Sequence, residues 1–311
     1  MEKIATREAY GKTLAALGSV NKDIVVLDAD LSKSTKTNIF AKEFPDRFFD
    51  MGIAEANMAA TAAGLSLAGK TVFFSSFAVF ATGRAFEIIR NSICYPNLNV
   101  KIAATHGGIT VGEDGGSHQS IEDIAIMRVL PNMEIYVPAD SIETQKIVEY
   151  MANSNGPQYL RLGRSGQPVI LDDDFKFQPG KAQCLRDGKD VAIMACGIMV
   201  AEALSAAEEL AKENIEAAVL NMSSIKPLDV GAIKKYAAQC GAIVTAEEHS
   251  IIGGLGSAVA EALVAATPCP VTFVGVEDRF GQSGKPADLL KEYGLTAENI
   301  KSKVHEVLKR K

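Results

Sequence analysis

The sequence from residue 100 to residue 126 reads VKIAATHGGITVGEDGGSHQSIEDIAI, and it decides the fold that we expect for this chain. It starts with an apolar run at 100–104, passes through a glycine-rich polar segment at 112–119, and returns to apolar periodicity from Ile121. This order predicts a buried strand, a loop and a helix. Glycine-rich loops can bring donors close to a small polar ligand, so 112–119 is a candidate binding loop. A solvated surface loop whose glycines only satisfy turn geometry is the alternative.

The first half of the chain repeats this alternation of strand-like and helical patterns. Its strand-like runs are apolar throughout, as expected when helices cover both faces of a parallel sheet. The predicted strands are 23–27, 71–74, 100–104 and 134–137, and the predicted helices are 7–17, 56–67, 84–94, 121–129 and 141–151. Repetition of strand and helix in this way predicts a doubly wound α/β fold.

The second half of the chain predicts another α/β unit after a linker. Gly, Pro and charged residues without periodicity mark 167–188, so we expect a first domain at 1–166 and a second at 189–311. The predicted strands of the second domain are 191–196, 216–220, 242–245 and 271–274, and its predicted helices are 200–212, 256–266 and 296–311. The sequence therefore predicts two doubly wound domains with mostly parallel sheets.

Composition restricts the classes of function. The 311 residues are 47% hydrophobic and 23% charged, which is ordinary for a globular protein. A net charge of −6 provides no basic footprint for nucleic acid, so local Arg, Lys and His side chains would have to hold any anionic ligand. The first residues are polar, unlike a secretory signal, and no apolar run is long enough to cross a membrane, so we expect a cytoplasmic protein. The five cysteines are widely spaced without a Cys-x-x-Cys pair, which argues against a disulfide framework or a zinc site.

Glu55 is a candidate catalytic residue because it lies in the nearly apolar stretch 51–58, at the start of a predicted helix. Burial disfavours an ionised carboxyl group, whereas a helix N-terminus favours it. A carboxyl group under these opposed effects is suited to share a proton with a ligand nitrogen. An ordinary acidic residue that satisfies free helix amides is the alternative.

Aromatic and basic residues follow three other strand-like runs. Phe77 and Phe80 come after a predicted strand, where parallel sheets place ligands, although core packing is the commoner role of such rings. His106 and His118 lack further metal ligands at a recognisable spacing, so hydrogen bonding or proton shuttling fits them better than metal binding. Arg161 and Arg164 follow a strand-like run at 158–160, where an Arg can hold a phosphate bidentately, with a surface salt bridge as the alternative.

Together with these residues, the whole chain resembles the C-terminal half of transketolase. The motifs that carry the resemblance occur in the family's order over both domains, and they are Thr6-Arg7-Glu8-Ala9-Tyr10-Gly11, Leu27-Asp28-Ala29-Asp30, Phe44-Pro45-Asp46-Arg47-Phe48, Gly52-Ile53-Ala54-Glu55, Gly112-Glu113-Asp114-Gly115, Ser117-His118-Gln119, Ile225-Lys226-Pro227-Leu228-Asp229 and Ser283-Gly284-Lys285-Pro286. Glu248-His249 also matches a pair in the family's last domain. The chain departs from many members at Gly116, where they have proline, and at Gly83, which replaces a larger residue.

The resemblance implies a pyrimidine-binding domain up to about residue 166 and the family's C-terminal domain from about residue 189. It implies thiamine diphosphate and Mg²⁺, bound between this chain and a pyrophosphate-binding domain whose Gly-Asp-Gly metal motif has no counterpart in the sequence. We therefore expect a separate pyrophosphate-binding subunit, an α₂β₂-type assembly and no metal ligand in this chain. The implied reaction transfers a two-carbon ketol unit between sugar phosphates of the pentose phosphate pathway, with the cofactor as electron sink.

The resemblance also implies roles for individual residues. Glu55 matches the glutamate that hydrogen-bonds the aminopyrimidine ring and favours its imino tautomer. Phe80 matches the ring that stacks on the pyrimidine, with Phe77 as its neighbour, and Asp30 falls among the implied cofactor-binding residues. The implied sugar-phosphate ligands are Ser34, His106, Asp114, His118 and Arg164, and His106 and His118 are also implied to be catalytic.

Three other interpretations stay open. The synthase of deoxyxylulose phosphate shares the fold and the cofactor, but the Gly-Glu-Asp-Gly and Ile-Lys-Pro-Leu-Asp segments favour transketolase. A β subunit of a 2-oxo acid dehydrogenase lacks the Gly-Glu-Asp-Gly loop. A non-catalytic structural or regulatory partner is disfavoured because the candidate site residues are retained.

Overall fold

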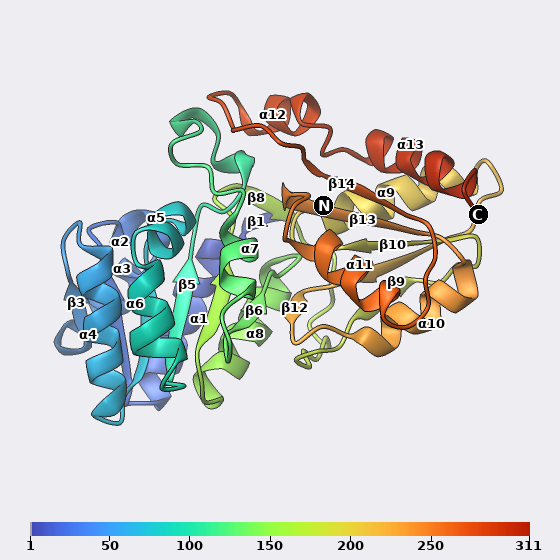
Figure 1. Ribbon diagram of the computed structural model, residues 1–311. Coiled ribbons are helices and arrows are strands. Elements are labelled where there is room, and N and C mark those ends of the chain that lie inside the picture. Colours follow the sequence, from blue (N-terminus) through green and yellow to red (C-terminus); the bar gives the residue numbers. More distant parts are fainter. Residues whose placement is uncertain (1) are drawn as a thin grey trace.

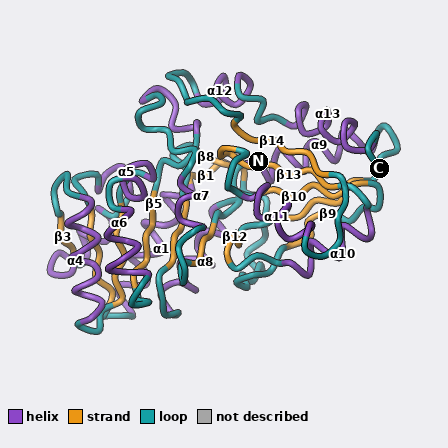
Figure 2. The backbone as a smooth tube through the Cα atoms, in the orientation of Figure 1, coloured by secondary structure: helices purple, strands orange, loops and turns teal. Residues whose placement is uncertain are grey.

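The computed structural model describes residues 2–311, which form two α/β units lying side by side (Figure 1). Figure 2 shows the strands of each unit, in orange, gathered between purple helices. The predicted class, two doubly wound domains with mostly parallel sheets, is confirmed.

The first unit contains a seven-stranded sheet in the order β12-β6-β7-β5-β4-β2-β3. Neighbouring strands are parallel, except that β12 comes from the second half of the chain and pairs antiparallel with β6. The strands are β2 Ile24–Asp28, β3 Phe48–Asp50, β4 Thr71–Ser75, β5 Val100–Ala104, β6 Glu134–Tyr136, β7 Gln158–Arg161 and β12 Ser224–Lys226. The helices are α1 Thr6–Val20, α2 Ser32–Thr35, α3 Asn38–Glu43, α4 Glu55–Leu67, α5 Ala78–Gly83, α6 Phe86–Ile88, α7 Asp123–Arg128 and α8 Ser141–Asn153, with short helical turns η1 Pro45–Arg47, η2 Ile89–Cys94 and η3 Ile109–Asp114.

The second unit contains a five-stranded sheet in the order β14-β13-β10-β11-β9. Only β9 runs antiparallel to its neighbour in this sheet. The strands are β9 Gln183–Arg186, β10 Val191–Ala195, β11 Ala217–Asn221, β13 Ile243–Ser250 and β14 Val271–Val276. The helices are α9 Met199–Ala211, α10 Val230–Cys240, α11 Leu255–Val264, α12 Pro286–Glu292 and α13 Ala297–Leu308.

The segment 167–188, predicted as a linker, contributes strands at two places. Its first residues complete β8 (Gly166–Pro168), which pairs antiparallel with β1 (Lys3–Ala5) near the chain start. Further along, β9 adds an edge strand to the second sheet by pairing with β11. The segment is therefore held to both units by backbone hydrogen bonds.

The helix predicted at 84–94 is wrong in its extent and type. The chain turns helical earlier, at α5, and after Arg84 continues through α6 into the π-helical turn η2. Ala78, Ala81, Ala85 and Ile89 are fully buried at a spacing of three to four residues, so one apolar stripe faces the core from residue 78 onward. The helix α10 was also missing from the predicted elements, although Asp229 caps its N-terminus by accepting from the Ala232 N–H.

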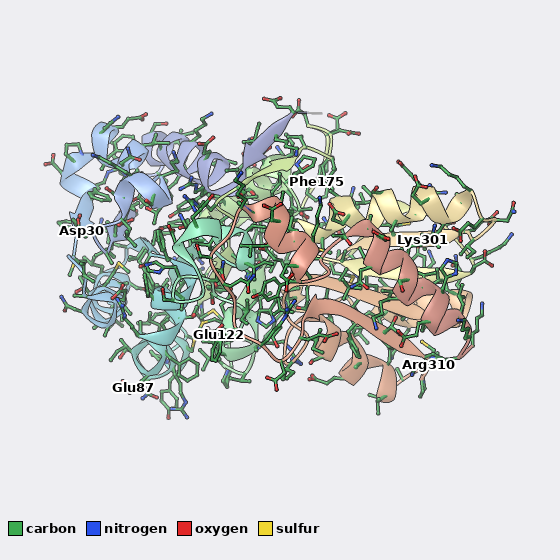
Figure 3. All side chains as sticks on the ribbon, turned by 90° about the horizontal axis from the view of Figure 1, so that it is seen from above. Asp30, Glu87, Glu122, Phe175, Lys301 and Arg310 are labelled. Atoms are coloured by element: carbon green, nitrogen blue, oxygen red, sulfur yellow. The ribbon has the colours of Figure 1, made fainter. Side chains whose placement is uncertain are left out.

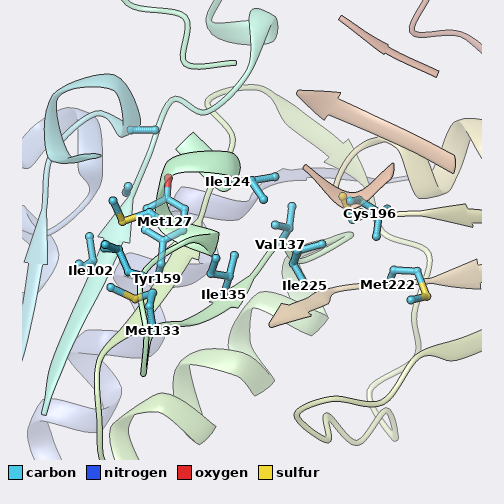
Figure 4. Packing of buried hydrophobic residues seen from close by; sticks show 14 of the residues in the cluster. Ile102, Ile124, Met127, Met133, Ile135, Val137, Tyr159, Cys196, Met222 and Ile225 are labelled. Atoms are coloured by element: carbon cyan, nitrogen blue, oxygen red, sulfur yellow. The ribbon is translucent and has the colours of Figure 1, made fainter. Parts of the chain in front are cut away.

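One hydrophobic cluster crosses from the first unit to the second. Ile135 and Val137 belong to the β6 segment, whereas Cys196, Met222 and Ile225 come from the second half of the chain, and all five are buried. Figure 4 shows these side chains in a continuous band of buried residues. The shared core fixes the second unit against the first.

The carboxyl ends of four parallel strands lie along one edge of the first sheet. Because β2, β4, β5 and β7 are mutually parallel, the loops that follow them gather at that edge. These loops carry most of the residues predicted as a site. Within residues 2–311, no helix has the length and apolar character needed to cross a membrane, and the five cysteines are free.

Candidate active site

Four rings predicted as site residues meet at this edge. Phe77 and His106 stack, with ring centroids 3.7 Å apart, and Phe77 and Phe80 stack at 6.0 Å. His118 lies edge-on to Phe80 at 5.3 Å. Phe77 immediately precedes α5 and Phe80 lies in its first turn, so one helix start positions both phenylalanines. An aromatic surface of this kind can stack against a flat heterocycle.

His106 is a neutral histidine. It follows β5 with a positive φ of 60°, and only 2% of its surface is exposed. Its Nδ1 lies 2.8 Å from Thr105 Oγ1. Burial, followed by the charges of Arg7 and Arg164, lowers the pKa of His106 to about 3. The side chain therefore acts as an uncharged hydrogen-bonding group at physiological pH.

Glu55 is buried at the start of α4 and pairs with an arginine that is distant in the sequence. Its side chain is 3% exposed, and Arg84 Nη1 donates to Oε1 at 3.1 Å and to Oε2 at 3.2 Å. The Arg84 guanidinium also lies over the Phe80 ring, with its carbon 4.2 Å from the ring centroid. Arg84 was not predicted because it follows α5, 29 positions from Glu55, and no local pattern links the two residues.

A cluster of positive charge faces His106. Arg7 Nη1 donates to the Ser34 carbonyl oxygen at 2.8 Å, which ties the start of α1 to the loop after β2. Burial, and then the charge of Arg164, lowers the pKa of Arg7. The guanidinium groups of Arg7 and Arg164 therefore lie close to the neutral His106, and Arg7 contacts Ser34. Within residues 2–311, Arg7 Nε is buried without a hydrogen-bond partner. Arg7 lies in one of the resemblance motifs, which is the one signal that could have identified it.

Arg164 connects this charge to the glycine-rich loop. Its Nη1 donates to the Val111 carbonyl oxygen and lies 3.5 Å from Glu113 Oε2 and 3.9 Å from Asp114 Oδ2. His118, at the far end of the same loop, has its Nδ1 2.9 Å from Ser117 Oγ. The predicted substrate-binding set therefore converges on this loop and the adjoining arginines.

Asp30 does not join this cluster. It is exposed, has a φ of 60°, and donates its backbone N–H to Asp50 Oδ1 at 3.0 Å. Figure 3 shows it at the far end of the first unit. The buried neighbour Asp28 instead organises the loop that holds Ser34, because it accepts from Thr35 Oγ1 and from the Leu31 N–H. Burial raises the pKa of Asp28 to about 6.

No metal centre is present among the described residues. Within residues 2–311, no group of three or more His, Cys, Asp or Glu side chains is arranged to hold a metal ion. The site instead offers the buried carboxyl group of Glu55, the aromatic rings of Phe77 and Phe80, and the neighbouring guanidinium groups of Arg7 and Arg164.

Fold and site define a two-domain α/β protein whose polar site lies at the carboxyl edge of its first sheet. Residues 2–168 match the model of the transketolase pyrimidine-binding domain, and residues 180–300 match the transketolase C-terminal domain. The chain belongs to the transketolase family. This confirms the resemblance inferred from its motifs.

Similar proteins agree with this assignment. A putative transketolase C-terminal section from Methanocaldococcus jannaschii is 50% identical over 307 residues, which cover 98% of this chain and 96% of that protein. Human transketolase is 40% identical over 311 residues, which cover 99% of this chain but 49% of the human protein. A solved structure described as a split-gene transketolase in an inactive β4 tetramer is 59% identical, has a TM-score of 0.93 and covers 99% of either chain. These matches support a transketolase subunit, as the motifs predicted.

Neutral His106 should make the folded chain sensitive to acid. An exposed histidine has a pKa near 6.5, so the folded state binds fewer protons than the unfolded state between about pH 6.5 and pH 3. The free energy of unfolding therefore decreases as the pH falls from about 6.5 to about 3, because the unfolded state gains a proton at His106 that the folded state does not bind. A His106→Asn variant keeps a residue that tolerates positive φ but cannot titrate.

Urea unfolding of both proteins at a series of pH values measures this effect. The free energy of unfolding of the wild type, minus that of the variant, should stay constant above about pH 7 and fall below pH 6.5. A difference that is independent of pH between 4 and 7 would contradict the assignment of a neutral, buried His106.

Proposed function

We propose that this chain is the pyrimidine-binding half of a two-chain, thiamine diphosphate-dependent transketolase. It would transfer a two-carbon ketol unit from a ketose phosphate to an aldose phosphate. The observation that carries this proposal is the buried Glu55 carboxyl group, which Arg84 joins to the Phe80 ring. The Arg7–Arg164 cluster lies on other segments of the same sheet edge. Family membership makes this the favoured chemistry for such a site.

The residues present fit the aminopyrimidine of thiamine diphosphate. A buried carboxyl group can hold a proton at a ring nitrogen, and Phe80 with Phe77 offers a face on which a flat ring can stack. When bound, the cofactor supplies an electron sink for cleaving and forming the carbon–carbon bond. We assign the Mg²⁺ and the diphosphate to the partner subunit, since Mg²⁺ prefers carboxylate and phosphate oxygens and residues 2–311 assemble no group that could hold it.

The arginine cluster fits the phosphate of a sugar substrate. Arg7 and Arg164 repel one another in the absence of an anion, and a phosphate bound between them would relieve that repulsion. Ser34 and neutral His106 would add hydrogen bonds to the phosphate. Asp114 and His118 would contact the hydroxyl and carbonyl groups at the reacting end of the sugar.

The proposed active assembly contains a second kind of subunit. A relative at 59% identity is described as inactive in a β4 tetramer, which agrees with a chain that needs a second subunit. We propose an α₂β₂ complex with a pyrophosphate-binding chain in the cytoplasm, acting on sugars of the pentose phosphate pathway.

The proposed reaction can be tested directly with the two chains. The purified chain, mixed with a pyrophosphate-binding transketolase subunit from the same organism, thiamine diphosphate and Mg²⁺, should transfer a ketol unit from xylulose 5-phosphate to ribose 5-phosphate. Either chain alone should be inactive. A folded complex that shows no transfer, or that consumes pyruvate instead, would rule out this function.

Glu55→Gln should abolish turnover while the complex still assembles. The amide has a similar shape but cannot hold or release a proton, so we expect kcat to fall by more than about 100-fold. Glu298→Gln is a matched control, because Glu298 lies in the first turn of α13, away from the site. Wild-type rates in Glu55→Gln would show that the reaction does not require the Glu55 carboxyl group.

Arg84 should compete with the cofactor, because it occupies both Glu55 and the Phe80 ring. Removing it in Arg84→Ala releases an ion pair and a cation–π contact worth together about 1–2 kcal/mol. We therefore expect thiamine diphosphate to bind the preassembled complex about 5- to 30-fold more tightly. Titration calorimetry measures the dissociation constant.

Arg310→Ala serves as the control for loss of one positive charge. Arg310 lies at the opposite end of the molecule (Figure 3), where its Nη1 donates to the Val271 carbonyl oxygen. This variant should bind the cofactor as the wild type does. Unchanged or weaker binding in Arg84→Ala would mean that Arg84 does not obstruct the cofactor.

A further inference from the structure

The glycine-rich loop is held in place by the second domain. We name residues 107–119 the substrate loop, and Glu248, Gln282 and Ser283 the clamp. We propose that the clamp, through Glu248 above all, sets the position of the substrate loop and so makes Glu248 a positioning residue for substrate binding. This proposal rests on the proposed function, and it gives the Glu248-His249 motif a role.

Glu248 contacts the start of the helical turn in the substrate loop. Its Oε1 accepts from the Thr110 N–H at 2.7 Å, although the two residues are 138 positions apart. Both side chains are buried. Thr110 is the second residue of η3, which is kinked at Gly112 and ends at Asp114. The hydrogen bond therefore anchors the first part of the segment that carries the Asp114 carboxylate. A hydrogen bond that a buried backbone N–H donates to a carboxylate is among the stronger ones in proteins.

The backbone at Gly108 is shaped to admit the Glu248 carboxyl group. Gly108 has a φ of 84°, a conformation that favours glycine, and a Cβ at this position would collide with the carboxyl atoms of Glu248. The acid therefore lies directly against the loop backbone. This close approach requires both the glycine and the acid.

Gln282 and Ser283 hold the other end of the substrate loop. Ser283 Oγ donates to the Glu113 carbonyl oxygen at 2.7 Å. Gln119 Nε2 donates to the Gln282 carbonyl oxygen at 2.9 Å and, within the loop, to the Gly112 carbonyl oxygen at 3.2 Å. Figure 1 shows the loop and the segment before α12 side by side.

Gly116 lies in close contact with the segment of the second domain around Gly281. A Cβ at Gly116 would lie 2.6 Å from the Gly281 carbonyl oxygen, and real Cβ atoms do not approach oxygen so closely. The glycine that replaces the family's proline is therefore required by the neighbouring segment of the second domain. The loop shape and the clamp depend on each other.

The buried Arg161 of the first domain stabilises Glu248 in its position. Burial raises the pKa of Glu248, whereas the charge of Arg161 and the Thr110 bond act in the opposite direction. Arg161 Nη2 also donates to the Glu248 carbonyl oxygen at 3.0 Å. Glu248 is thus fixed by its backbone and by its side chain, which makes it a rigid support for the loop.

Loss of the clamp should therefore act on substrate binding. Asp114 Oδ2 lies 3.9 Å from Arg164 Nη1, and a loop free to move would no longer hold these groups at a fixed separation. In the complex with its partner subunit, Glu248→Ala should raise the KM for xylulose 5-phosphate by about 5-fold or more, with a smaller change in kcat. Glu248→Gln retains the acceptor for Thr110 and should stay within about 2-fold of the wild type.

Hydrogen exchange measured by mass spectrometry on this chain alone tests the clamp without any catalysis. Peptides covering 109–116 should exchange about 10-fold faster or more in Glu248→Ala, and at the wild-type rate in Glu248→Gln. Should Glu248→Ala fail to fold, Ser283→Ala removes one clamp contact and should shift exchange and KM in the same direction.

Asp229→Ala separates positioning from general destabilisation. Asp229 accepts from the Ala182 and Ala232 N–H groups in the second domain, so its loss should lower the melting temperature but leave the KM and the exchange of 109–116 unchanged. Unchanged exchange in Glu248→Ala would overturn the clamp, and faster exchange with an unchanged KM would overturn its role in positioning. Absence of transfer by the wild-type complex would instead reject the proposed function, while the exchange result would still judge the clamp.

Discussion

A single buried guanidinium, that of Arg161, is the interaction on which the two-domain structure depends. Its Nε donates to Asp123 Oδ2 at 2.7 Å, and its Nη2 donates to the carbonyl oxygens of Ser120 and Glu248. Burial alone would lower the pKa of Arg161, but Asp123 and Glu248 raise it above its usual value, so the group stays charged. Leaving such a charge without its partner costs about 3–5 kcal/mol. The end of β7, the start of α7 and strand β13 are therefore brought to one point.

The same guanidinium fixes where the substrate loop begins and ends. Gly107 packs against Arg161 so closely that a Cβ there would lie 2.8 Å from Nε. Its neighbour Gly108 donates its N–H to the Ser120 carbonyl oxygen at 2.7 Å, next to the Arg161 contact. The loop thus leaves and re-enters the fold at one place, and the clamp determines its shape between those ends.

Much of the fold could be predicted from the sequence, because each central strand is a short run of residues buried on both faces. The start of α4 at Glu55 was also predictable from the nearly apolar stretch 51–58, and the rings at Phe77 and Phe80 were predictable because they follow the buried strand β4. What could not be predicted depends on pairs far apart in the chain. Arg84 meets Glu55 across 29 positions, and Glu248 meets Thr110 across 138, and no periodicity links either pair.

The incorrectly predicted segment at 84–94 shows why local periodicity was insufficient. Buried apolar residues recur every three to four positions from Ala78 to Ile89, although this segment is divided into α5, α6 and the start of η2. The helix has wider, π-type turns in η2. Wider turns of this kind are frequent at functional sites. Arg84 lies at the junction of α5 and α6, which brings its guanidinium onto the Phe80 ring. The interruption between α5 and α6 therefore falls at the residue that contacts both Glu55 and the Phe80 ring.

The charges of the site suggest which ligands this chain binds and which the proposed partner subunit binds. This chain has a net charge of −6, yet it places Arg7 and Arg164 beside an uncharged His106. Anion binding is therefore a local property of one sheet edge and not of the whole surface. Glu55 at the same edge is buried and already paired with Arg84. A metal-bound diphosphate needs several free oxygen ligands. Under the proposed function, these must come from the partner, so this chain would contact the pyrimidine and the substrate phosphate while the partner would hold the metal and the diphosphate.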